Sequence, residues 1–245
     1  MKTDRDKELL EKIKQIRAEH PFWGYRRISA WLRRRCDIPV NRKRVYRIMR
    51  EHNLTVKMKQ YKVKRTPTTS KPKPTRPNQW WGIDMTKFII DRLGWVYLVV
   101  VLDWHTRKIV GYEIGIQSKS TDWLKALDMA VKEQCPDGVR EYNINLMSDN
   151  GSQPTSKAFI NACTTLEIEQ AFTSYNNPKG NANTERVIRT LKEDCIWINE
   201  WGSLEEAQKA IEQWIHDYNH LYPHSALDYL SPIEYEQMFS KQKAA

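Results

Sequence analysis

The sequence predicts an α/β fold with a mixed sheet, preceded by a small all-α region of the helix-turn-helix type. Three observations carry this prediction. The first third of the chain shows short helical periodicities separated by breaks, the middle shows three consecutive strands, and the remainder alternates helices with strands. A meander followed by alternating helices and strands is typical of an α/β layer in which parallel and antiparallel strands are mixed.

The N-terminal region contains three predicted helices. Apolar side chains share one helical face in residues 4–19 and again in residues 25–35. Asn41 can cap a third helix over residues 42–52, whose basic side chains point largely away from its apolar positions. A helix, a short break and a basic helix outline a helix-turn-helix DNA-binding region, which we assign to residues 1–54. The DNA contacts expected from its third helix are Arg42, Lys43, Arg44, Arg47 and Arg50.

Charge is distributed unevenly along the 245 residues. Residues 1–76 hold 24 Lys and Arg against 7 Asp and Glu, a net charge of +17. The remaining residues hold 16 Lys and Arg against 23 Asp and Glu, a net charge of −7. The overall charge of +10 is therefore the sum of a basic first third and an acidic remainder. Basic runs often only hydrate a helix surface, but +17 in so short a stretch favours a polyanion partner. We therefore expect the first third of the chain to bind DNA.

Residues 55–78 lose periodicity and are rich in proline and in basic side chains. Such a composition predicts an extended linker without packing of its own. The segment could be passive, and its charges suit equally well a strand that follows DNA phosphates. The linker cations expected to contact DNA are Lys62, Lys64 and Arg65.

Residues 79–240 form the predicted core with its C-terminal helices. Strands are expected over residues 79–90, 95–103, 109–116, 143–148 and 168–173, and helices over residues 120–133, 155–166, 183–197 and 204–220. The longest apolar run, Trp95–Leu102, is too short to cross a bilayer, and the N-terminus has no apolar signal core. We therefore expect a soluble, cytoplasmic protein with no membrane partner. Four widely spaced cysteines argue against a disulfide framework or a cysteine-rich zinc site.

Three acidic residues stand where acids have little structural use. Asp84 lies inside an extended apolar segment, Asp149 ends a buried-type strand, and Glu185 begins a helix after a polar loop. If the strands of Asp84 and Asp149 are neighbours, their carboxylates converge at one edge, and the loop can fold Glu185 onto them. Such a cluster of hard oxygen ligands suits Mg²⁺ or Mn²⁺. Two such ions could activate a water or a sugar hydroxyl in phosphodiester chemistry.

Each acid also has an ordinary structural interpretation. Asp149 lies in Asp-Asn-Gly, a common turn sequence. Glu185 suits the first turn of a helix, where it could pair with Arg189. Asp84 could protect an edge strand from pairing with other chains. Taken singly, these interpretations are favoured, and only the combination of motifs reverses that judgement.

The order and spacing of five segments resemble the OrfB transposases of the IS-three family of bacterial insertion sequences, which are similar to retroviral integrases. The segments are Trp81–Thr86, Ser148–Gln153, Gly180–Glu185, Tyr218–Leu227 and Ser231–Pro232. The family's spacing of 35 residues between its second Asp and its Glu is met. Its basic residue seven positions after the Glu is also present, as Lys192. The resemblance covers roughly residues 20–240.

The resemblance implies an RNase H-like catalytic core that cuts and joins transposon ends. By this analogy Asp84, Asp149 and Glu185 are catalytic and bind two divalent ions, Mg²⁺ or Mn²⁺. Water attacks the phosphodiester at the transposon end, and the freed 3′-hydroxyl attacks a second phosphodiester without a covalent protein–DNA intermediate. Lys192 is expected to contact phosphate beside the metals, and we expect Arg189 of the same helix to contact DNA as well.

The implied partners are transposon-end and target DNA, further copies of the chain on DNA, and an OrfA protein or an OrfA fusion. Two positions depart from the family pattern. Pro154 stands where an aromatic residue is common, and Tyr222 where Arg or Lys is common, so an expected phosphate or acid contact lacks its cation there. Two other functions stay open at the level of sequence. They are a non-catalytic DNA-binding regulator or partial transposase dependent on an OrfA partner, and an RNase H-type nuclease.

Overall fold

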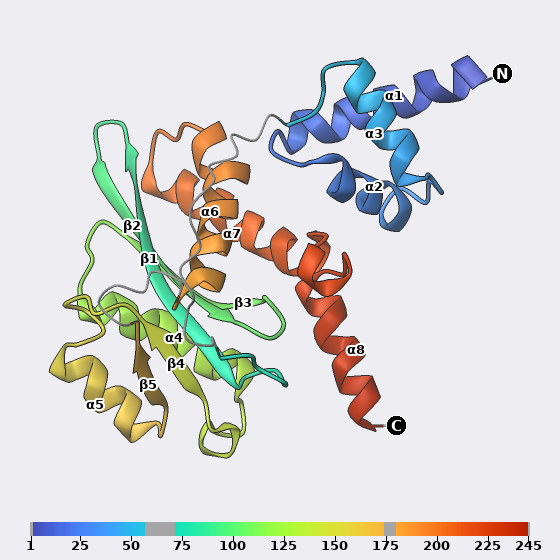
Figure 1. The fold of residues 1–245 in the computed structure, drawn as a ribbon. Coiled ribbons are helices and arrows are strands. Elements are labelled where there is room, and N and C mark those ends of the chain that lie inside the picture. The colour runs from blue at the N-terminus through green and yellow to red at the C-terminus, as the bar shows by residue number, and fades with distance from the viewer. Residues whose placement is uncertain (1, 57–71, 174–179, 245) are drawn as a thin grey trace, which may run out of the picture. The chain divides into compact units, whose positions relative to one another are not determined.

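The computed structural model describes residues 2–56, 72–173 and 180–244, and these form two compact units (Figure 1). The N-terminal unit comprises the chain as far as Pro67 together with Leu221–Ser231. The core unit comprises Thr68–His220 and Pro232–Ala245. The sequence led us to expect one continuous core over residues 79–240, whereas the structure gives Leu221–Ser231 to the N-terminal unit. Of the predicted linker over residues 55–78, residues 57–71 lie outside the described part.

The N-terminal unit contains the three predicted helices, α1 (Lys2–Glu19), α2 (Tyr25–Arg34) and α3 (Arg42–Glu51). Asn41 caps α3 as predicted, because its side-chain oxygen accepts a hydrogen bond from the backbone N–H of Lys43 at 2.8 Å. Apolar side chains from all three helices close a small core that includes Ile13, Ile28, Leu32, Val45 and Met49. The helix-turn-helix outline therefore folds around an apolar centre, and its basic side chains stay outside.

Leu221–Ser231, which we call the return segment, packs against α2. Only 6% of Tyr222 is exposed, and its ring meets that of Trp23 edge-on with the centroids 5.5 Å apart. The guanidinium carbon of Arg27 lies 4.7 Å from the centroid of the Tyr222 ring. At this separation an arginine gains a cation–π attraction. The aromatic residue that departs from the family pattern therefore receives a cation from α2 instead of supplying one.

Two further contacts join the return segment to the basic helices. Arg34 of α2 donates a hydrogen bond to the backbone oxygen of Asp228 at 3.2 Å. The guanidinium carbon of Arg42 lies 5.3 Å from the centroid of the Tyr229 ring. Asp228 and Tyr229 both have positive φ angles, 51° and 63°, so the backbone turns sharply where these contacts are made. The return segment is thus a folded part of the N-terminal unit.

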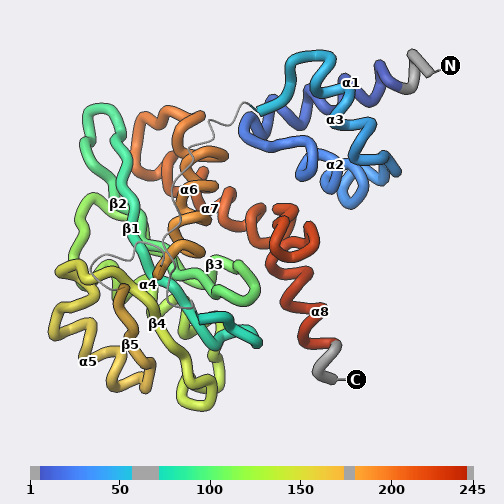
Figure 2. The backbone as a smooth tube through the Cα atoms, in the orientation of Figure 1, coloured from blue at the N-terminus to red at the C-terminus, as the bar shows by residue number. Residues whose placement is uncertain are grey.

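The core unit is built on a five-stranded mixed sheet, as the sequence predicted. Its strands are β1 (Trp80–Ile90), β2 (Gly94–Asp103), β3 (Ile109–Gly115), β4 (Asn145–Ser148) and β5 (Glu169–Phe172). The spatial order is β3-β2-β1-β4-β5. The first three strands form an antiparallel meander, and β4 and β5 run parallel to β1. Figure 2 traces this path through the central strand β1.

Among the described residues, five helices follow the meander or alternate with the later strands. They are α4 (Ser120–Gln134), α5 (Lys157–Thr165), α6 (Ala182–Asp194), α7 (Leu204–Leu221) and α8 (Pro232–Ala244), with short 3-10 turns at Arg140–Tyr142, Ile196–Ile198 and Ser225–Leu227. Helices α4, α5 and α6 pack on the strands. Trp81 and Ile83 of β1 pack into the main apolar core with Trp123 of α4 and Phe159 of α5. Because side chains alternate along a strand, Asp84 projects from the opposite face, where α6 packs on β1 and β2.

The elements differ from their predicted bounds in a few places. The helix predicted over residues 183–197 ends at Asp194, and Ile196–Ile198 form a separate 3-10 turn. The fourth strand begins at Asn145 because Asn143 takes a left-handed conformation with a φ of 48°. Helix α8 has no counterpart in the predicted elements. Across the described ranges, no helix is both long enough and apolar enough to span a membrane.

Candidate active site

The three candidate carboxylates come from three elements that meet beside β1. Asp84 lies within β1, Asp149 directly follows β4, and Glu185 lies in the first turn of α6. Strands β1 and β4 are parallel neighbours, with Gly82 opposite Met147, so continuing this register by two residues brings Asp84 level with Asp149. The condition stated from the sequence, that these two strands be neighbours, is met. Since β1 is the central strand, the edge-strand interpretation of Asp84 is wrong.

Asp84 is half-buried, whereas Asp149 and Glu185 are exposed, and the charges of both act on Asp84. Burial raises the pKa of Asp84 to about 6, and the negative charges of Asp149 and Glu185 act in the same direction. The backbone N–H of Met85, which donates to the Asp84 carboxylate at 2.8 Å, and the positive charge of Lys192 lower this pKa. Asp84 therefore lies within the field of both other carboxylates and of the lysine that the family spacing singles out.

The donor chemistry of the three side chains fits a hard divalent ion, because all of their ligand atoms are carboxylate oxygens. Asp149 also makes the turn contact that its sequence suggests, since its Oδ1 accepts the backbone N–H of Gly151 at 3.0 Å. Within the part of the chain that the structure describes, no three His, Cys, Asp or Glu side chains lie close enough together to form a ready cage for an ion. The three carboxylates therefore fit a hard divalent ion by the chemistry of their donor atoms.

The start of α6 is tied to the sheet by two side-chain hydrogen bonds. Asn181 donates from its Nδ2 to the backbone oxygen of Ile83 at 3.1 Å. Trp104, just after β2, donates from its Nε1 to Thr184 Oγ1 at 3.1 Å. The sequence motifs contain Asn181 and Thr184, but sequence reasoning gave them no role. The sequence signal that could have pointed to them is Gly82, because a glycine inside a strand often marks a place where another part of the chain comes close to the backbone.

The two predicted DNA contacts on α6 lie in different settings. Lys192 is half-buried, and its charge reaches Asp84. Arg189 is exposed and forms an ion pair with Glu193, at 2.8 Å between Nε and Oε1. The pair suggested from the sequence, Glu185 with Arg189, stays a prediction beside this observed pair.

The predicted cations of α3 separate into two groups. Arg44 and Arg47 both bind Asp6 of α1, at 2.6 and 2.7 Å, and Arg47 also pairs with Glu51. Hydrogen bonds from Arg47 and Arg44 lower the pKa of Asp6. These two arginines therefore connect α1 to α3. The linker cations Lys62, Lys64 and Arg65 lie outside the described residues.

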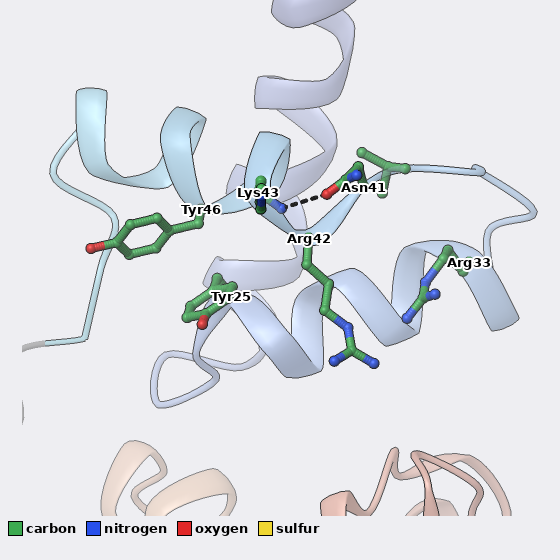
Figure 3. A pocket seen from close by; sticks show the side chains of 7 residues that line it. Tyr25, Arg33, Asn41, Arg42, Lys43 and Tyr46 are labelled. Carbon is green, nitrogen blue, oxygen red and sulfur yellow. Dashed lines mark hydrogen bonds between the residues drawn. The ribbon is translucent and has the colours of Figure 1, made fainter.

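The other group on α3 faces an open pocket at the start of the helix (Figure 3). The residues that line it are Tyr25, Arg33, Val40, Asn41, Arg42, Lys43 and Tyr46. Figure 3 shows the side chains of Arg33 and Arg42 extending toward the same side. The Tyr25 and Tyr46 rings lie 4.9 Å apart, centroid to centroid. Sequence reasoning missed Arg33 and the two tyrosines, which are brought together by the turn between α2 and α3. Arg50, at the far end of α3, is exposed.

Comparison with known proteins finds families that match both the N-terminal region and the rest of the chain. The family described as "HTH-like domain" matches residues 4–62, and two families described as "Integrase core domain" match residues 74–178 and 166–232. Among curated proteins, the transposase InsD for insertion element IS2A/D/F/H/I/K of Escherichia coli is 28% identical over 236 residues, which cover 94% of this chain and 78% of InsD.

Solved structures share the fold of the core. A chain of the simian T-cell lymphotropic virus intasome, determined in complex with the PP2A regulatory subunit B56 gamma, superposes with a TM-score of 0.58 at 17% identity. The alignment covers 91% of this chain and 74% of that one. The catalytic core domain of BIV integrase gives a TM-score of 0.50 at 15% identity and covers 69% and 99% of the two chains. The predicted integrase-type, RNase H-like core is therefore confirmed.

The integrase core is a metal-dependent family, and the matches together support a DNA-binding transposase. The transposase relative aligns with both parts at once, over nearly the whole of this chain. A helix-turn-helix-like region joined to an integrase core in this order places the chain in the IS-three family of DNA transposases of bacterial insertion elements.

Proposed function

We propose that this transposase uses Asp84, Asp149 and Glu185 to bind two divalent ions, Mg²⁺ or Mn²⁺, and so cuts transposon ends and joins them to target DNA. The observation that carries the proposal is the coupling of Asp84 to both other carboxylates where two parallel strands meet α6. When bound, the ions supply the Lewis acidity that activates a water or a 3′-hydroxyl and stabilises the leaving oxygen.

The chain's own side chains hold and orient the reacting groups. The backbone N–H of Met85 holds Oδ1 of Asp84, and both residues belong to β1, the central strand of the sheet. The orientation of this carboxylate is therefore set by a rigid element. Lys192 is placed to neutralise a DNA phosphate beside the carboxylates. Arg189 can exchange its exposed pair with Glu193 for a phosphate at little cost, because exposed ion pairs contribute about 0–1 kcal/mol.

End binding is assigned to the pocket side of the N-terminal unit. Arg42 and Lys43 lie at the start of α3, and the first residues of a recognition helix are the ones that reach base edges in helix-turn-helix proteins. Arg33 adds a third cation, and Arg50 extends the basic surface along α3. Because Arg44 and Arg47 already bind Asp6, we assign them to holding the helices together. Lys62, Lys64 and Arg65 remain expected phosphate contacts.

Transposon ends and target DNA are the proposed substrates, with several copies of the chain acting together on DNA. The family resemblance also supports an OrfA protein or fusion as a partner in end recognition.

The carboxylates are tested by Asp84→Asn, Asp149→Asn and Glu185→Gln in a strand-transfer assay on transposon-end DNA with Mg²⁺. Losing one ligand of a catalytic ion removes several kcal/mol of transition-state stabilisation, so we expect joining to fall by about 10³-fold. DNA binding in a gel shift should stay unchanged, because the N-terminal unit is untouched. Asp91→Asn, in the exposed turn after β1, is the matched control and should keep full activity.

Undiminished joining by the three variants would overturn the site assignment. Fragments without joined products from the unaltered protein would instead identify a nuclease. Specific end binding with no metal-dependent cleavage or joining would identify a DNA-binding regulator.

A further inference from the structure

Asn181 links the two elements that carry Asp84 and Glu185. The residue is 3% exposed and precedes α6, yet its side chain does not cap the helix. Its Nδ2 donates instead to the backbone oxygen of Ile83, the residue just before Asp84. Its own backbone oxygen accepts the N–H of Glu185 at 3.1 Å. A single residue thus connects the backbone beside Asp84 to the backbone of Glu185.

Thr184 makes the second link, from inside the same helical turn. Its side chain is fully buried, and its Oγ1 accepts the indole N–H of Trp104 at 3.1 Å. Trp104 is itself held to the beginning of β1, because its backbone N–H donates to the Trp80 oxygen at 3.0 Å. Asn181 and Thr184 are three residues apart and so lie on one face of the helix. Both face the sheet, and Glu185 follows directly.

Gly82 makes this close approach of helix and sheet feasible. A Cβ atom at Gly82 would collide with Thr184 Oγ1 and with Trp104 Nε1, and it would lie 2.7 Å from Asn181 Oδ1. Gly82 is two residues from Asp84 and therefore on the same face of β1. Any larger residue would push the start of α6 away from the strand that carries Asp84.

We propose that Asn181 and Thr184 are positioning residues that lock the first turn of α6 onto the sheet and thereby hold Glu185 within reach of a metal ion bound by Asp84. This inference rests on the proposed function of the three carboxylates. Groups of this kind, which orient metal ligands without touching the metal, typically change metal affinity or activity by about 10- to 100-fold when they are removed.

Thr184→Val tests the proposal with little change in volume, and Thr184→Ser keeps the hydroxyl. Thr190→Val is the matched control, because Thr190 lies in the same helix and its hydroxyl donates its hydrogen bond to the backbone oxygen of Arg186, one turn earlier. We expect Thr184→Val to weaken Mn²⁺ binding, followed by electron paramagnetic resonance, by about 10-fold or more. In strand transfer it should lower kcat and leave the KM for DNA unchanged. Thr184→Ser should restore both, and Thr190→Val should change neither.

Hydrogen exchange of the Glu185 amide supplies a readout that needs neither metal nor activity. Thr184→Val should speed this exchange while the amides of the last turn of α6 keep their rates. Gly82→Ala should have the same effect, and Gly115→Ala, with nothing within 4 Å of the added Cβ, should have none.

Unchanged exchange and unchanged Mn²⁺ affinity in Thr184→Val would overturn the positioning role. Equal effects of Thr184→Val and Thr190→Val would also overturn it, by showing only a general loss of stability. If Glu185→Gln left Mn²⁺ binding intact, the carboxylate site itself would fail, and the amide exchange would still decide whether the two residues hold the helix.

Discussion

In the N-terminal unit the cations of α3 lie on an exposed surface, whereas in the core unit a half-buried carboxylate, Asp84, lies within the field of two exposed ones. Asp6 pairs with Arg44 and Arg47, so one acid orders two of the cations. Around Asp84, burial and the other two carboxylates act together to raise its pKa to about 6. Exposed like charges stay hydrated and cost little, while the buried Asp84 carboxylate carries a cost that a bound cation would remove. The first arrangement is consistent with the proposed DNA-binding surface, and the second with the proposed metal site.

The two units also differ in what completes their packing. In the core unit, α6 is joined to the sheet by buried hydrogen bonds beside Gly82. In the N-terminal unit, the return segment is joined to α2 by aromatic and cation–π contacts around Tyr222. Each set of interactions can be disturbed separately, which gives ways to test how independent the units are.

The largest effect on stability is expected from Tyr222→Ala. Truncating a buried aromatic residue typically costs 3–5 kcal/mol, so we expect the N-terminal unit to lose about 3 kcal/mol. Hydrogen exchange should show faster opening of α1, α2 and α3, with the amides of β1 and β2 unchanged. Tyr222→Phe is the control, because it keeps the ring over Arg27 and against Trp23. Equal loss of protection in the sheet would show that the two units unfold together.

Asp84→Asn should stabilise the metal-free core unit. The pKa of Asp84 is about 6 in the folded chain against an ordinary value of 3.8, so the folded state binds the proton more tightly. The ionised carboxylate therefore lowers stability at pH values above 6 by roughly 2–3 kcal/mol, and this cost disappears as the pH falls from 6 toward 4.

Urea unfolding of the core unit between pH 4 and pH 8 would measure this effect. We expect Asp84→Asn to be more stable than the unaltered protein at pH 8 and to show less dependence on pH, while Mg²⁺ stabilises only the unaltered protein. Asp91→Asn should behave as the unaltered protein does. A loss of stability in Asp84→Asn at pH 8 would contradict the unfavourable burial of this charge.

The smallest expected effect is on the salt dependence of DNA binding. It distinguishes the pocket-facing cations of α3 from the two arginines that pair with Asp6. Removing one side chain that binds a phosphate should reduce the slope of log affinity against log salt concentration by about 0.9. We expect this reduction for Arg42→Ala, which faces the pocket. Arg44→Ala should keep the slope and weaken the packing of α1 on α3. Binding of end DNA over a salt series measures the slopes, and identical slopes for the two variants would remove the distinction between them.

Local patterns made most of the fold predictable. The helices of the N-terminal unit follow from apolar spacing and the cap at Asn41 from its side chain, whereas the pairing of the strands of Asp84 and Asp149 could be stated only as a condition. The return segment was not predictable, because Tyr222 and Trp23 lie ~200 residues apart and periodicity reports only on the element that contains it. The pairing of Asp6 with two arginines escaped prediction for the same reason.

Motif spacing singled out the candidate carboxylates, but not the groups that hold their elements together. Asp84, Asp149 and Glu185 were identified by motif spacing, which carries no information on burial or on charge coupling. Gly82 could have suggested a close approach at β1. Nothing local indicated that Thr184 and Trp104, which belong to different elements, would be the groups that meet there.

The return segment has a consequence for the order in which the chain folds during synthesis. Domains generally fold from the N-terminus as they emerge from the ribosome. Here Trp23 and Arg27 emerge early, but the side chain that covers them, Tyr222, is translated only after all five strands of the sheet. We expect the nascent DNA-binding helices to stay incompletely packed until then. A product of premature termination before Leu221 would therefore carry these helices without Tyr222, and the N-terminal unit would complete its packing only once nearly all of the sequence for the core had been translated.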